Sequence, residues 1–88
     1  MNIKITSKEL EATEAIKDYI EKKAERLEKY FGAEFDVYAT IKTEGSDKVA
    51  EISIKADTQD YRAVTAHRDL YASIDKDIDI LEGQIRKT

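Results

Sequence analysis

Few side chains in this 88-residue sequence could carry out catalysis or hold a metal. His67 is the single histidine, and the chain has no cysteine. The sequence therefore offers no second imidazole and no thiolate to complete a metal site or an acid-base pair. We expect no enzymatic activity, no metal and no cofactor. We interpret His67 as a polar residue in the turn before a helix, where Asp69 shares the capping.

The acidic run Asp75, Asp77, Asp79 has the spacing that opens a calcium-binding loop. Such a loop needs glycine at its sixth position and glutamate at its twelfth, because the chain must turn sharply and then supply a bidentate ligand. These positions hold Ile80 and Arg86. The better interpretation is a solvated acidic face on a helix.

Basic residues in the segment 13–31 form the pattern that most suggests a binding function. At about 100° per residue, Lys22, Arg26 and Lys29 fall within roughly 60° of one another on a helix, and Lys23 lies beside them. Cations about one helical turn apart can meet successive phosphates of a folded RNA. We therefore expect these residues to form a basic stripe along one edge of the helix.

The same charges also allow a purely structural interpretation. Asp18 with Lys22 and Glu25 with Lys29 have the i,i+4 spacing of ordinary ion pairs on a charged helix. Each such pair contributes a few tenths of a kcal/mol. Both interpretations remain open from the pattern alone.

Hydrophobic periodicity predicts six elements in the order β-α-β-β-β-α. Alternation with period two indicates strands, and apolar residues at steps of three and four indicate helices. The inward face of the fourth strand is not assignable from its sequence. Each helix carries one apolar stripe, so the expected fold class is α+β, a four-stranded sheet with both helices packed on one face. The strands are expected over residues 2–6, 35–42, 50–56 and 61–66, and the helices over 13–31 and 70–85.

Composition is consistent with one folded domain over residues 1–88. Hydrophobic residues make up 41% and charged residues 39% of the chain, which argues against a disordered segment. No window approaches the run of about 20 apolar residues that a membrane span needs, so we expect no membrane association and a cytoplasmic protein. The formal net charge is -4. That sum counts against a general nucleic-acid binder, although a polyanion responds to the local arrangement of charge.

Four segments also carry a family resemblance: 2–8, 12–16 leading into 26–31, 67–75 and 81–87. In this order and spacing they are similar to the bacterial hibernation-promoting factors and ribosome-associated inhibitors. The fold implied by the resemblance is again β-α-β-β-β-α, related to double-stranded RNA-binding domains. The chain resembles the short forms of this family or the N-terminal domain of a long form.

The resemblance implies a protein that is no enzyme and binds the small ribosomal subunit and its rRNA. Members of the family occupy the channel for tRNA and messenger RNA and stop translation under stress or in stationary phase. Long members dimerise ribosomes through a C-terminal domain that is absent here. Carried over by position, the rRNA-binding residues are Lys22, Lys23, Arg26, Lys29, Arg62, Arg86 and Lys87.

Two positions in the last helix depart from the family pattern. Ile80 and Gly83 stand where the family usually has basic residues. Gly83 also costs about 1 kcal/mol of helix propensity relative to alanine. The alternative function is therefore a protein-interaction module that kept the fold but lost RNA binding, with Ile80 and the acidic last helix as its contact surface.

Overall fold

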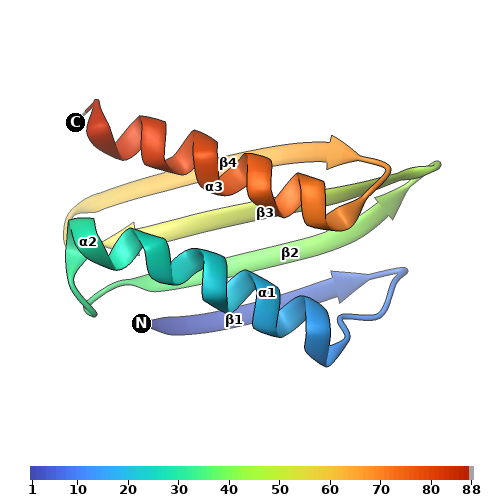
Figure 1. Cartoon of the computed structure of the whole chain (residues 1–88), viewed down its shortest axis with the longest axis horizontal. Coiled ribbons are helices and arrows are strands. Elements are labelled where there is room, and N and C mark those ends of the chain that lie inside the picture. The colour runs from blue at the N-terminus through green and yellow to red at the C-terminus, as the bar shows by residue number, and fades with distance from the viewer. Residues whose placement is uncertain (88) are drawn as a thin grey trace.

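The computed structural model describes residues 1–87 and confirms the α+β fold (Figure 1). A short 3-10 segment, η1, interrupts the first helical stretch. In chain order the elements are β1 (Asn2–Lys8), α1 (Glu14–Ala24), η1 (Glu25–Leu27), α2 (Glu28–Phe31), β2 (Asp36–Glu44), β3 (Asp47–Ala56), β4 (Gln59–His67) and α3 (Leu70–Arg86).

The four strands form one sheet in the order β1-β2-β3-β4. β1 runs parallel to β2, because the first helical stretch returns the chain to the end where β1 began, while the other two pairings are antiparallel. The first helical stretch and α3 lie side by side on one face of the sheet and leave the other face open (Figure 1). α1 and α3 run in the same direction, so the C-terminal ends of the two helical stretches lie at one end of the molecule.

Local sequence signals set the ends of the first helical stretch. The hydroxyl of Thr13 accepts a hydrogen bond from the Ile16 amide at 3.2 Å and satisfies one of the unpaired N–H groups of the first turn. The stretch ends at Gly32, whose φ of 66° is readily reached only without a Cβ. The predicted helix over 13–31 is therefore confirmed.

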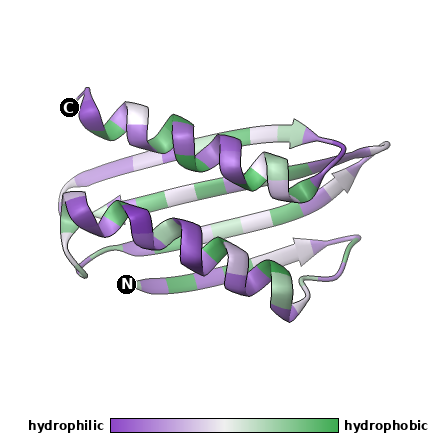
Figure 2. Cartoon of the chain, in the orientation of Figure 1, coloured by the Kyte–Doolittle hydropathy of each residue, from purple (hydrophilic) through white to green (hydrophobic). Residues whose placement is uncertain are grey.

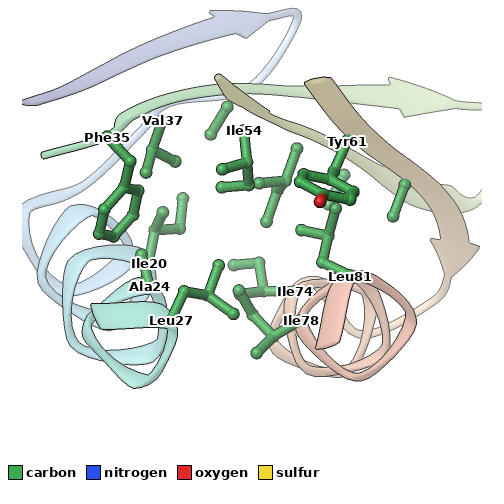
Figure 3. Packing of buried hydrophobic residues seen from close by; sticks show 14 of the residues in the cluster. Ile20, Ala24, Leu27, Phe35, Val37, Ile54, Tyr61, Ile74, Ile78 and Leu81 are labelled. Carbon is green, nitrogen blue, oxygen red and sulfur yellow. The ribbon is translucent and has the colours of Figure 1, made fainter. Parts of the chain in front are cut away.

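The core lies between the helices and the sheet (Figure 3). Leu27 of η1 and Ile74 and Ile78 of α3 meet the inward side chains of the strands, and all three helical side chains are fully buried. In Figure 2 both helices alternate between purple and green segments, as expected for helices with one apolar face. The inward face of β4, which periodicity left open, consists of Tyr61 and Ala63 with Thr65.

Candidate nucleic-acid interface

Three of the four predicted basic residues of the first helical stretch lie along the outer seam between that stretch and α3. There they face a row of carboxylates on α3. The Lys23 ammonium is 3.5 Å from Asp75 Oδ1, and the Arg26 guanidinium is 3.8 Å from Asp79 Oδ1. We call this row of opposed charges, completed by Lys29 and Glu82, the interhelical charge row.

Glu82 is the buried member of the interhelical charge row, with only 4% of its surface exposed. Its Oε1 accepts from Arg26, and its Oε2 lies 3.3 Å from the Lys29 ammonium and accepts from the Tyr30 hydroxyl at 3.1 Å. Burial by itself would raise the pKa of Glu82, but the hydrogen bonds from Tyr30 and Lys29 and the charge of Arg26 together lower it. Glu82 is thus an ionised carboxylate that links α3 to the first helical stretch.

An aromatic pair, Tyr19 and Tyr71, lies at the end of the seam opposite to Glu82. The rings of Tyr19 and Tyr71 meet edge to face with their centroids 4.8 Å apart, and the Lys23 ammonium lies 5.4 Å from the Tyr19 ring centroid. The Tyr19 hydroxyl donates to Asp75 at 2.6 Å. That hydrogen bond is the main reason that the pKa of Tyr19 rises to about 12. Tyr19 therefore stays neutral and keeps its donor proton at physiological pH.

The sequence-predicted residues fall into three groups. Lys23, Arg26 and Lys29 lie in the interhelical charge row. Arg62 lies on the open face of the sheet, where its guanidinium is 3.1 Å from Glu51, so the structure separates it from the helical cations. The remaining three are exposed and have no ion pair within residues 1–87: Lys22 on α1, and Arg86 and Lys87 at the C-terminal end of α3.

The expected basic stripe is present, but carboxylates of α3 pair with three of its four cations. The structural alternative is wrong, since Asp18 forms no pair with Lys22 and Glu25 forms none with Lys29 in the part of the chain that the structure describes. The ion pairs cross between helices. A signal was present: the acidic residues of α3 recur at steps of four and three, and the basic residues that pair with them recur at steps of three, so both sets repeat about once per helical turn.

The interpretation of the acidic run as a solvated helix face is confirmed for Asp75 and Asp79, which belong to the interhelical charge row and keep 46% and 68% of their side chains exposed. It is wrong for Asp77, which is fully buried against β4. The Thr65 hydroxyl donates to Asp77 Oδ1 at 2.6 Å, whereas Oδ2 has no hydrogen-bond partner among the described residues. Ile80 is half-buried and packs against the core, so it is not the exposed contact that the alternative function required.

The turn before α3 is as expected. The Asp69 carboxylate accepts from the Tyr71 amide at 3.0 Å and caps the helix, and His67 Nδ1 accepts from the Asp69 amide at 3.1 Å. Among residues 1–87 no three histidine or acidic side chains come together in a way that could hold a metal ion. None of the helices in that range is both long and apolar enough to cross a membrane.

Comparison with known proteins places the chain in a family. Residues 3–88 match the family described as Sigma 54 modulation protein / S30EA ribosomal protein. A ribosome hibernation promoting factor of Escherichia coli (strain K12) is 31% identical over 87 residues, which cover 99% of this chain and 92% of that protein. A ribosome hibernation promotion factor of Lactococcus lactis is 40% identical, and the match covers 94% of this chain but 46% of the relative.

Solved structures agree with these sequence matches. The N-terminal domain of Thermus thermophilus Protein Y superposes with a TM-score of 0.92 at 38% identity, covering 99% of this chain and 98% of that one. A ribosomal subunit interface protein from Coxiella burnetii has the same fold, with a TM-score of 0.87 at 20% identity. The chain belongs to the S30EA family, the family of ribosome hibernation-promoting factors that its sequence resembles.

Proposed function

We propose that this domain is a ribosome-associated hibernation factor. It binds rRNA of the small ribosomal subunit, occupies the channel for tRNA and messenger RNA, and inhibits translation by steric occlusion under stress or in stationary phase. The observation that carries the proposal is the match of nearly the whole chain to ribosome hibernation promoting factors that are themselves little longer. The family and relatives' names given above are those of ribosome-associated factors.

The arrangement of charge refines which residues would contact RNA. Buried Glu82 holds Arg26, so Arg26 contributes chiefly to the packing of the helices. Lys29 keeps 61% of its side chain exposed and can turn toward a phosphate. The two helical stretches end at the same side of the molecule (Figure 1), so Lys29 of α2 lies at the same end as Arg86 and Lys87, which are exposed and have no ion pair within residues 1–87. We therefore assign the main RNA contact to this end, together with Lys22.

Co-sedimentation with vacant ribosomes across a salt series tests the proposal. The variant neutralises the four assigned cations: Lys22→Gln, Lys29→Gln, Arg86→Gln and Lys87→Gln. The logarithm of the binding constant falls linearly with the logarithm of the salt concentration, and each lost phosphate contact should reduce the steepness of that line by about 0.7 to 0.9. The variant should therefore bind more weakly and with a flatter salt dependence. Its circular dichroism spectrum should stay unchanged, because all four side chains are exposed and Glu82, which loses Lys29, keeps its contacts with Arg26 and Tyr30.

A matched control removes the same charge from the sheet: Lys4→Gln, Lys8→Gln, Lys42→Gln and Lys55→Gln. Its affinity should stay within about twofold of the native domain if position, and not net charge, decides binding. Equal losses in both variants would contradict the assigned surface. Absence of binding by the native domain at low salt would contradict the proposed function itself.

A further inference from the structure

The two edge strands of the sheet, β1 and β4, differ in how their outer backbone groups are hydrogen-bonded. At the β4 edge, Gln84 of α3 donates to the Arg62 carbonyl at 2.9 Å and accepts from the Arg62 amide at 3.4 Å, so a helical side chain satisfies edge backbone groups. At the opposite edge, β1 has no neighbouring strand within residues 1–87. A regular seven-residue strand with an open edge is a template on which another strand can add.

The hydrogen bonds of β1 show which backbone groups are available. The Asn2 amide donates to the Phe35 carbonyl at 3.2 Å, on the side of β2. Backbone groups point to alternate edges along a strand, so the amides of Ile3, Ile5 and Ser7 point to the open edge. These three amides could pair with an added strand without breaking the existing ladder.

A groove of about 330 Å³ lies beside β1, between that strand and α1. Ile3 and Ile5 line it and are only half-buried, although they pack against the core. Its other wall is formed by α1 residues Glu14, Lys17, Asp18 and Glu21. The groove therefore combines incompletely covered apolar surface with a strongly acidic wall.

The charges of this wall are poorly compensated. Lys17 lies 3.9 Å from Glu14, a loose and exposed contact, and Asp18 and Glu21 have no ion pair in the described part of the chain. We call Glu14, Asp18 and Glu21 the acidic row. Its members are separated by about 6 and about 4.5 Å along the helix. Alternate side chains of a strand are about 6.6 Å apart, so an added strand presents every second side chain to the acidic row.

We propose that the β1 edge and the acidic row bind an extended, lysine- or arginine-rich segment of a partner protein as a fifth strand. Main-chain hydrogen bonds to β1 supply the attachment, as in other complexes formed by strand addition. The long stems of the inward basic side chains cover Ile3 and Ile5, and their charged ends reach the acidic row.

The negative charge of the acidic row favours a basic segment over a second copy of this chain or an RNA. Pairing with a second copy through β1 would bring two acidic rows together, between molecules whose net charge is -4 each. RNA would meet the same carboxylates, so this surface is distinct from the one assigned to rRNA. The inference therefore stands independently of the proposed function.

Amide exchange measured by NMR tests the proposal, with a short synthetic peptide that alternates lysine and threonine as the probe. On saturation, exchange at the Ile3, Ile5 and Ser7 amides should slow by about tenfold or more, because they become hydrogen-bonded. A peptide of the same composition with its lysines grouped together should leave these rates unchanged. Slowing by both peptides, or by neither, would overturn strand addition.

Variants test the acidic row. Glu14→Gln with Asp18→Asn and Glu21→Gln should weaken peptide binding by about tenfold at low salt. The matched control, Glu25→Gln with Glu28→Gln and Glu34→Gln, removes the same charge away from the groove and should change affinity by less than about twofold. Equal weakening in the two variants would show a non-specific charge effect and overturn the assignment.

A third variant blocks the edge and leaves the charge unchanged. Ser7→Pro removes one amide that faces the open edge, at a position where an edge strand tolerates proline. Peptide affinity should fall by about tenfold while the unfolding midpoint stays close to that of the native domain. Unchanged affinity in Ser7→Pro would mean that the peptide binds without pairing to β1, and would overturn the proposal.

Discussion

Asp77 should make this domain less stable as pH rises through neutrality. Burial raises the pKa of the carboxyl from 3.8 to about 7, the hydrogen bond from Thr65 opposes this, and the negative charge of Glu51 adds to it. The folded state therefore binds a proton that the unfolded chain has already lost. Stability is fully present below the unfolded pKa and is lost as pH rises toward the folded one.

The size of the effect follows from the two pKa values. A shift from 3.8 to about 7 corresponds to roughly 4 kcal/mol of stability lost between about pH 4 and pH 8. For a small domain whose total stability is about 5 to 15 kcal/mol, this is a large fraction. Asp77→Asn provides the comparison, since the amide has nearly the shape of the protonated acid and keeps an acceptor for Thr65.

Urea unfolding of both proteins, followed by circular dichroism from about pH 5 to pH 8.5, measures the difference. Asp77→Asn should be the more stable by about 1.6 kcal/mol at pH 5, where the unfolded carboxyl is already ionised, and by up to about 4 kcal/mol at the alkaline end. If the two curves run parallel, or if the native domain gains on the variant as pH rises, the reasoning is refuted.

Three further substitutions test the interhelical packing and the helix ends by urea unfolding. Glu82→Gln should destabilise the domain by about 2 to 3 kcal/mol, because Arg26 and Lys29 lose the charge of their buried partner. The pKa of Glu82 is lowered in the folded state, so the difference in stability between the native domain and the variant should shrink as pH falls through that folded-state pKa. A difference that does not change with pH would contradict this. Gly83→Ala should stabilise α3 by up to about 1 kcal/mol, since an added Cβ would meet no atom within 4 Å, and a loss of stability would show a hidden clash. Thr13→Ala should cost about 1 kcal/mol through the lost N-cap, and an unchanged midpoint would show that the cap contributes nothing.

Local patterns were sufficient to predict the elements and their order. Apolar spacing placed the buried faces of both helices, and the Thr13 and Gly32 signals fixed the ends of the first helical stretch. The alternation expected over 35–42 is confirmed, because Val37 and Ile41 are buried while Tyr38 on the open face of the sheet is 41% exposed. These features depend on residues a few positions apart, which is why a single sequence can show them.

The partners of the charged residues could not be predicted in this way. Arg26 and Glu82 are 56 positions apart, and the same number separates Tyr19 from Asp75. Whether such residues meet depends on the direction and the offset of two helices on the sheet, which no local pattern specifies. The basic stripe was therefore located correctly on the first helical stretch, but its neutralisation was missed.

By itself, the sequence determined the α+β fold, the buried faces of the elements other than β4, and the family. Only the tertiary structure decided which charges are compensated, that Asp77 is buried with one oxygen unpaired, and that β4 is a covered edge while β1 is an open one. The physical reason is range: hydrophobic periodicity acts within an element, whereas ion pairing, desolvation and edge protection arise where elements distant in the chain come into contact.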